Sequence, residues 1–234
     1  MREFERNVAG ISALADPVRQ RLYEFVGSQA EPVSRDQAAA AVGIARHQAK
    51  FHLDRLEAEG LLETDYVRLT GRTGPGAGRP AKRYRRGRTE LSVTVPAREY
   101  DLAADIMAAA ITTCATKGIP IEEAVQRAAA DYGVAMAGGS GHVSSTAAAL
   151  SRLIAALDEH GYEPRQAGRA ISLANCPFHA LAQRHTQLVC QMNHALLAGL
   201  AGAIAPGCFE VRLEPGEERC CVTVTEEAAD PGER

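Results

Sequence analysis

The sequence of 234 residues predicts an α+β fold built from two small domains. Two observations support this fold class. Helix-capping residues and apolar residues at helical spacing recur over residues 16–60 and again over residues 98–136. Short segments typical of strands occur in pairs around turns rich in glycine and proline, over residues 61–86, 162–173 and 208–225.

The composition excludes several classes of protein. Apolar residues make up 46% and charged residues 24%, which are ordinary globular values and exclude disordered and collagen-like chains. No apolar run approaches the roughly 18–20 residues that a membrane-spanning helix needs, and residues 1–6 lack the apolar core of a signal peptide. We therefore expect a cytoplasmic protein that does not bind membranes.

The net charge of −3 conceals two opposite halves. Residues 1–90 contain 16 Lys and Arg against 12 Asp and Glu, a balance of +4, whereas residues 91–234 contain 10 against 17, a balance of −7. Residues 68–88 carry eight basic side chains and no acidic one. This asymmetry predicts a polyanionic partner for the N-terminal half.

Capping residues predict three helices in the N-terminal half. Asp16 is the N-cap of the first helix, and Ser34 with Gln37 forms a capping box that begins the second helix, which ends at Gly43. The third helix spans residues 45–59 and carries its apolar residues at helical spacing on one face, which leaves a polar and basic face outward. Two helices joined by a short glycine turn form a helix-turn-helix.

Two strands after the third helix predict a β-hairpin wing, so that residues 1–90 form a winged helix-turn-helix DNA-binding domain. The strands are expected within residues 61–69 and 82–86, around the loop 71–81. In this arrangement the third helix reads base edges and the wing contacts phosphates. The residues expected to contact double-stranded DNA are Arg46, His47, Gln48, Lys50, Arg55, Arg79, Lys82 and Arg83. Phe51 fits either the core or a contact with a thymine methyl group.

The remainder of the chain predicts two further regions. Helices over residues 98–116 and 121–136 are rich in small residues, and the region 97–136 is expected to link the domains and to hold two copies together as a homodimer. Residues 145–234 follow the order α-β-β-α-β-β and are expected to form a sensor domain that contains most of the cysteines. In the last hairpin, the two-residue period of a strand places Cys220 on the apolar face and Cys221 on the opposite face.

Three blocks of the first half carry a family resemblance. Residues 14–23, 51–62 and 78–84 resemble bacterial winged-helix regulators of the ArsR type. The second half is similar to the SufR-like branch of these regulators in three motifs: Asn175-Cys176-Pro177-Phe178, Leu188-Val189-Cys190 and Arg219-Cys220-Cys221. The resemblance implies a transcriptional repressor that carries an iron–sulfur cluster on cysteines. The gap of 13 residues between Cys176 and Cys190 is one longer than this branch leads us to expect.

The cysteines themselves indicate a metal centre. All six lie beyond residue 110, and in a cytoplasmic chain such cysteines are typically free thiols, metal ligands or redox groups. Cys176 precedes Pro177 at the start of a predicted helix, where backbone N–H groups favour a thiolate. The predicted ligands are Cys176, His179, Cys190 and Cys220, with Cys208, Cys221 and an external ligand as alternatives for the fourth position. Such a set suits an iron–sulfur cluster or, alternatively, zinc.

Other interpretations of both halves remain open at this stage. The cysteines also fit buried packing or a metal-free thiol redox switch, and the sensor domain also fits a pocket for a small organic effector with structural cysteines. The N-terminal half also fits a helical bundle with a solvated basic face. An enzyme in which Cys176 is the nucleophile and His179 the base lacks an evident oxyanion donor, so we expect no catalytic residues.

Overall fold

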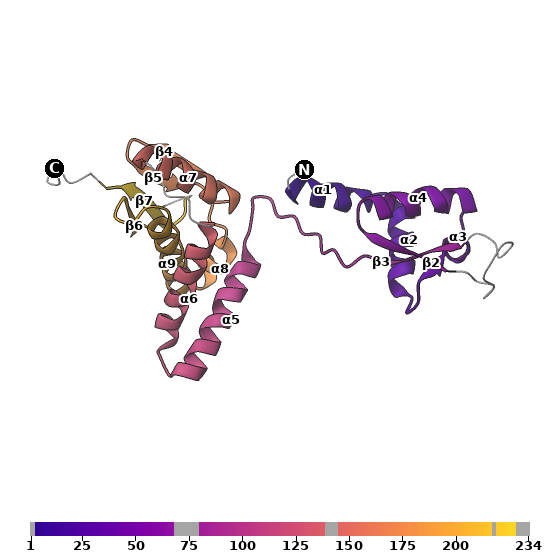
Figure 1. Ribbon diagram of the computed structural model, residues 1–234, viewed down its shortest axis with the longest axis horizontal. Coiled ribbons are helices and arrows are strands. Elements are labelled where there is room, and N and C mark those ends of the chain that lie inside the picture. Colours follow the sequence, from indigo (N-terminus) through magenta and orange to yellow (C-terminus); the bar gives the residue numbers. More distant parts are fainter. Residues whose placement is uncertain (1–2, 68–79, 139–144, 217–218, 228–234) are drawn as a thin grey trace. The chain divides into compact units, whose positions relative to one another are not determined.

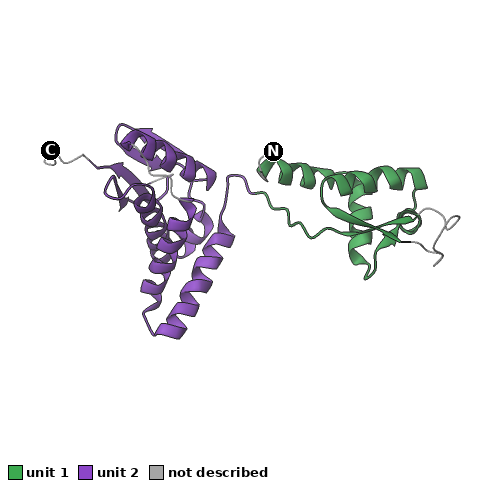
Figure 2. Cartoon of the chain, in the orientation of Figure 1, with its two compact units in different colours: residues 1–93 green, residues 94–234 purple. Residues whose placement is uncertain are grey.

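The structure is a computed structural model that describes residues 3–67, 80–138, 145–216 and 219–227. The chain divides into two units, Met1–Val93 and Thr94–Arg234, which are coloured separately in Figure 2. Each unit has its own apolar core. The prediction of an α+β fold with an N-terminal helix-turn-helix and a C-terminal sheet is confirmed (Figure 1).

The first unit contains four described helices and three described strands. In chain order these are α1 (Glu3–Ala13), α2 (Pro17–Ser28), β1 (Val33–Ser34), α3 (Arg35–Val42), α4 (Arg46–Ala58), β2 (Leu62–Val67) and β3 (Ala81–Arg86). The predicted cap of α2 is confirmed, because the Asp16 carboxylate accepts hydrogen bonds from the backbone N–H groups of Val18 and Arg19. The capping box of α3 is also confirmed: Ser34 accepts from the Gln37 backbone, and Gln37 accepts from the Ser34 backbone.

The turn between α3 and α4 depends on Gly43. This residue has φ of 73°, in the left-handed region that favours glycine, and its N–H donates to the Ala39 carbonyl at the end of α3. Beyond the turn, α4 buries Ala49, Leu53 and Leu56 completely, which confirms the predicted apolar stripe. The opposite face of α4 is therefore left to solvent.

The sheet of the first unit has the order β1-β3-β2, and all its described pairs are antiparallel. The β2–β3 hairpin is the predicted wing, although the loop at its tip, residues 68–79, lies outside the described residues. Tyr84 pairs with Thr64 on one side and with Val33 on the other, and only 2% of it is exposed. The wing is thus fastened to the core at its base.

Helix α1 was not expected from the sequence, and the structure adds it to the first unit. Phe4, Val8 and Ile11 stand at helical spacing, which is the signal that could have predicted it. The Asn7 amide donates to the Ser92 carbonyl at 2.9 Å, and Gly10 lies so close to Leu91 that a Cβ at position 10 would overlap the leucine side chain. These contacts join residues more than 80 positions apart and hold the helix in the unit.

The second unit consists of five described helices and a four-stranded sheet. Its elements are α5 (Tyr100–Lys117), α6 (Ile121–Met136), α7 (Thr146–Glu159), β4 (Pro164–Ala167), β5 (Ala170–Leu173), α8 (His179–Arg184), α9 (Thr186–Ile204), β6 (Phe209–Leu213) and β7 (Val222–Glu226). The sheet order is β4-β5-β7-β6, and every described pair is antiparallel. Among the described helices, none is long and apolar enough to cross a membrane.

Helices α5 and α6 belong to the second unit and do not form a separate region between two domains. Figure 1 shows α5, α6 and α9 side by side, and their buried residues join those of the sheet in one core. Helices α6 and α9 touch through their backbones. A Cβ on Gly133 would overlap the Leu196 carbonyl, and one on Gly199 would overlap the Ala130 carbonyl.

The prediction that Cys220 and Cys221 occupy opposite faces of a strand is wrong. The strand begins at Val222, so both cysteines lie in the irregular segment just before it, where alternation does not apply. Cys220 is 1% exposed, and Cys221 also packs against the core. Both thiols therefore reach the interior of the unit.

The contact of α6 with α9 provides a test of the fold. Replacing Gly133 by Ala is expected to lower the free energy of unfolding by about 1–3 kcal/mol, because the added methyl group meets backbone atoms that cannot move aside. Urea unfolding of the full chain, followed by circular dichroism, measures this change.

The matched control is Gly202→Ala in α9, where an added Cβ meets nothing within 4 Å. A helical glycine of this kind should tolerate alanine, with a gain of up to about 1 kcal/mol. Equal effects of the two substitutions would contradict the backbone contact.

Candidate functional site

The exposed face of α4 is the candidate DNA-reading surface. Arg46, His47, Lys50 and Phe51 lie at positions i, i+1, i+4 and i+5 of this helix, which places them on one side, and all four are exposed. The Phe51 ring is 67% exposed, so of the two roles left open for it, burial in the core is excluded. A large apolar ring among cations in solvent is unusual for a merely solvated face.

The cations on this face have carboxylate partners in the same unit. Arg46 pairs with Asp36 at the start of α3, and Lys50 lies 2.6 Å from an Asp54 oxygen one turn along α4. Arg55 pairs with Glu59 at 2.6 Å in the same way. These three cations are between 57% and 67% exposed, and such surface pairs contribute only about 0–1 kcal/mol each. Phosphates can therefore replace the carboxylates at little cost.

Lys82 and Arg83 of the wing are held more firmly. The Lys82 ammonium lies 3.1 Å from an Asp54 oxygen and also contacts Glu57, so that it joins β3 to α4. Arg83 bonds both oxygens of Asp65 on the neighbouring strand, at 2.9 and 2.8 Å. Only about a quarter of each of these basic side chains is exposed (27% and 25%). Both residues brace the wing in this structure.

The pKa values around Lys82 agree with this bracing role. Burial alone would lower the pKa of the Lys82 ammonium, but its bonds with Glu57 and Asp54 outweigh burial and raise the pKa above its ordinary value. For Asp54, burial acts to raise the pKa, and the bonds from Lys50 and Lys82 lower it overall. Burial also raises the pKa of the Tyr84 hydroxyl to about 12, and that hydroxyl donates to Asp54.

Two further predicted DNA contacts are Gln48 and Arg79. The Gln48 side chain accepts a hydrogen bond from the Ala45 backbone at 3.2 Å, so it caps α4 as well as lying exposed beside the reading face. Arg79 lies outside the described residues.

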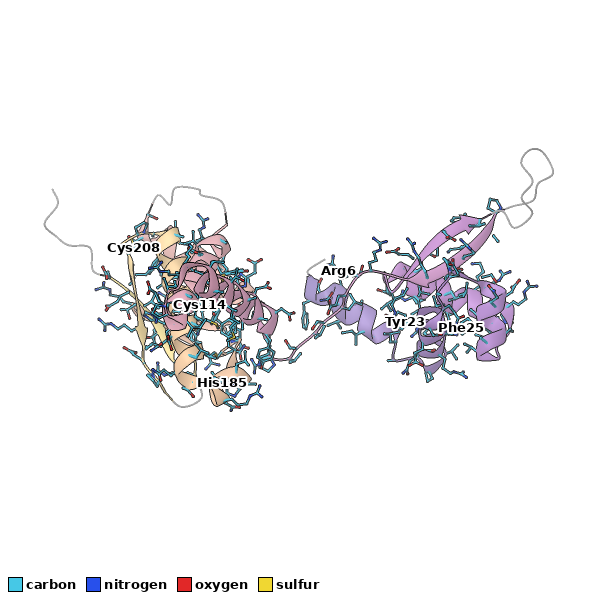
Figure 3. The ribbon with its side chains drawn as sticks, turned by 90° about the horizontal axis from the view of Figure 1, so that it is seen from below. Arg6, Tyr23, Phe25, Cys114, His185 and Cys208 are labelled. Carbon is cyan, nitrogen blue, oxygen red and sulfur yellow. The ribbon has the colours of Figure 1, made fainter. Side chains whose placement is uncertain are left out.

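The second candidate site is a chain of four thiols in the second unit. Within this chain, Cys176 lies beside Cys220, Cys220 beside its neighbour Cys221, and Cys221 beside Cys190, each pair close enough for a hydrogen bond between sulfurs. Three segments supply these sulfurs: Cys176 lies between β5 and α8, Cys190 is on α9, and the adjacent pair precedes β7. Cys114 and Cys208, labelled in Figure 3, lie at other points of the unit, on α5 and before β6.

Contacts among the thiols favour their protonated forms. The bond to Cys220, together with burial, raises the pKa of the Cys176 thiol far above its ordinary value. The bond that Cys220 accepts from Cys176 lowers the pKa of Cys220, but donation to Cys221 and burial outweigh it and raise the value to about 11. Burial also raises the pKa of the Cys190 thiol. A metal that binds here must displace protons.

The structure brings together three of the four predicted ligands, Cys176, Cys190 and Cys220. In place of His179 the fourth member of the thiol chain is Cys221, whereas His179 is exposed and lines a small pocket with Cys176 and Arg98. Among the described residues, no group of three or more His, Cys, Asp or Glu side chains is arranged to hold a metal ion. By donor type, however, four thiols fit zinc or an iron–sulfur cluster.

A shallow apolar groove lies elsewhere on the second unit, at the junction of α5, α6 and the start of α9. Its walls include Met107, Ile111, Val125 and Leu188, with Glu122 among the polar residues at its edge. This groove is separate from the thiol chain, since none of the cysteines lines it.

Sequence reasoning placed one feature of these sites wrongly and missed another. Cys221, named as an alternative fourth ligand, was expected on the wrong face because the strand was expected to begin too early. The carboxylate partners of the wing were missed because Asp54, Glu57 and Asp65 lie outside the acid-free segment 68–88. Antiparallel pairing of β2 with β3, which places Asp65 opposite Arg83, would have predicted one of these partners.

Comparison with known proteins identifies part of the first unit. The family model of a helix-turn-helix domain matches residues 14–65, which include α2, α3, α4 and part of β2. No curated protein and no solved structure matches the chain. The match agrees with the geometry of α3 and α4, and a domain of this kind indicates a DNA-binding regulator.

Proposed function

We propose that this protein is a transcriptional repressor that binds double-stranded DNA through α4 and responds to a metal centre held by the cysteines of its second unit. The observation that carries the DNA-binding part is the exposed face of α4, with Phe51 among Arg46, His47 and Lys50, inside a matched helix-turn-helix. The helix-turn-helix match favours a regulator over an enzyme.

The chemistry of α4 matches the edges of bases in the major groove. Arg46 at the start of the helix can donate two hydrogen bonds to guanine, and the Phe51 ring can pack on a thymine methyl group. Lys50 and Arg55 lie where they can exchange their carboxylate partners for phosphates. The bracing by Lys82 and Arg83 supports a wing of defined position beside this helix.

A homodimer is part of the proposal, since helix-turn-helix proteins commonly read two half-sites. Exposed apolar side chains support self-association. Phe4, Val8 and Ile11 lie on one face of α1 and are between 41% and 56% exposed, while Ile111 on α5 and Val134 on α6 are 62% and 54% exposed. Helices α5 and α6 thus remain candidates for the dimer contact.

The thiol chain supports the sensing part of the proposal. Cys176, Cys190, Cys220 and Cys221 would hold the group, which is an iron–sulfur cluster on the family resemblance or zinc on donor type alone. Such a group, when bound, would supply a redox-sensitive or exchangeable link between the three segments. Because the described side chains are not arranged to hold a metal ion, these segments would have to move for the group to bind. By linkage, if binding of this group changes the affinity for DNA, DNA must change the affinity for the group equally.

The groove between α5, α6 and α9 favours a second candidate function. In this alternative a small organic effector binds Met107, Ile111 and Leu188, and the cysteines are structural. The two candidates differ in their dependence on thiols, because cysteine replacement would leave the response to the effector intact.

Replacing Phe51 or Arg46 by Ala is expected to reduce the affinity for a specific duplex about tenfold. This loss lies within the range of about 1–3 kcal/mol that a lost base contact typically costs in binding free energy. The duplex is one that the full-length protein selects from a random library, and a scrambled duplex of the same length measures non-specific binding. Fluorescence anisotropy should show a loss for the selected duplex only. Arg212→Ala, which removes an exposed and paired arginine from the second unit, is the control. Equal losses on both duplexes would contradict base reading by α4.

Replacing Lys82 by Ala is expected to destabilise the wing by about 1–2 kcal/mol, between the values for exposed and buried pairs. The loss leaves Asp54 and Glu57 without the cation that joins them. Hydrogen exchange of the β2 and β3 amides measures the effect. Lys50 is 61% exposed, so Lys50→Ala should leave this hydrogen exchange unchanged. It should instead reduce the slope of the DNA-binding constant against salt concentration by the amount expected for about one lost phosphate contact. A Lys82 variant that behaves like the Lys50 variant would refute the bracing role.

Protein purified without oxygen is expected to contain zinc, or iron with acid-labile sulfide. The affinity of the Cys190→Ser variant for this metal should fall by more than about tenfold. Loss of a residue that only supports a ligand already lowers metal affinity by about this factor, and Cys190 is a proposed ligand. Cys208→Ser is the matched control, since Cys208 lies outside the thiol chain. Wild-type protein without zinc, iron or sulfide would refute the sensing part and favour the organic effector.

A further inference from the structure

A buried polar relay leads to the thiol chain and has no evident role in the fold. The Tyr162 hydroxyl donates to the Asn193 side-chain oxygen at 2.6 Å, and the Asn193 amide nitrogen donates to the Cys220 sulfur at 3.2 Å. All three residues are 1% exposed, within a core that is otherwise almost wholly apolar. Tyr162 follows α7, Asn193 is on α9, and Cys220 precedes β7, so the relay crosses the core.

Such a relay is costly unless it has a function. A buried side-chain amide costs free energy unless its polar groups are bonded, and an apolar residue at position 193 would avoid this cost. Its neighbours on α9, Met192, Leu196 and Leu197, are buried and apolar. Asn193 is therefore the exception on this face of the helix, and its amide is aimed at a sulfur of the proposed metal site.

The direction of each hydrogen bond in the relay suits a metal-bound sulfur, which carries no proton. The Tyr162 hydroxyl is the donor to Asn193. The Asn193 oxygen is thereby engaged, and the amide N–H faces Cys220. A thiolate can only accept hydrogen bonds, and an N–H donor stabilises this charged form.

We propose that Asn193 is a positioning residue for the thiol site, whose amide, oriented by Tyr162, donates a hydrogen bond to the Cys220 sulfur and holds this sulfur in place for a metal. This inference rests on the proposed function of the thiols. Hydrogen bonds to ligand sulfurs set both the affinity and the electronic properties of thiolate-bound metals.

The test uses Co²⁺ as a spectroscopic probe, added to reduced full-length protein without oxygen, and Zn²⁺ affinity measured against a competing chelator. Asn193→Leu replaces the amide by an apolar side chain with the same branching. The variant is expected to bind Zn²⁺ about 10- to 100-fold more weakly. The charge-transfer absorption band from sulfur to cobalt should move to lower energy. Without the N–H donor, the sulfur electrons are less stabilised and need less energy to transfer to the metal.

Two companion variants separate this role from simple packing. Tyr162→Phe keeps the ring in the core and removes the hydroxyl that orients Asn193, so the absorption band should shift in the same direction by a smaller amount. Gln187→Leu changes an exposed amide to leucine elsewhere on α9 and should leave band and affinity unchanged. Circular dichroism of each variant checks that it is folded.

The outcomes distinguish failure of the inference from failure of the proposed function. If wild-type protein binds Co²⁺ through thiolates and Asn193→Leu gives the same band and an affinity within about twofold, Asn193 has only a structural role and the inference is wrong, while metal sensing stands. If wild-type protein binds neither Co²⁺ nor Zn²⁺, the proposed metal site is wrong and the inference falls with it.

Discussion

Helix α9 is the element on which the second unit depends, and its backbone contact with α6 determines where it lies. At Gly133 and Gly199 the two helices approach so closely that no side chain fits between them. Helix α9 also contacts β6 and β7, and its residues Leu196, Leu200 and Ile204 are buried in the shared core. A rigid α9 in turn fixes the positions of Cys190 and Asn193, which it carries toward the segment before β7.

The thiol chain and the polar relay are consequences of that placement. Four sulfurs from three segments meet because α9, the β5–α8 segment and the start of β7 share one core. Cys220 is the buried member of this chain, and the other three thiols are partly exposed. The Tyr162–Asn193 relay adds a donor at the most buried of them. An arrangement with this many polar groups in an apolar core is more typical of a site than of packing.

In the first unit, the main physical theme is the pairing of charges. The wing cations, which the linear sequence presents as an unopposed basic segment, meet carboxylates of β2 and α4 in space. The helix cations are paired too, but at exposed positions where a phosphate can compete. Two kinds of arginine and lysine therefore coexist on one small domain: some hold its shape, and others remain available to a polyanion.

The sequence alone was sufficient for the α+β class, the caps of α2 and α3, the turn at Gly43, the buried stripe of α4 and the wing strands, because each depends on residues close together in the chain. It also singled out Cys176, Cys190 and Cys220. Only the tertiary structure decided where α1 packs, that α5 and α6 join the second core, that Cys221 and not His179 continues the thiol chain, and that Lys82 braces the wing. These features depend on contacts between residues far apart in the chain, and helical or strand periodicity carries no information about such contacts.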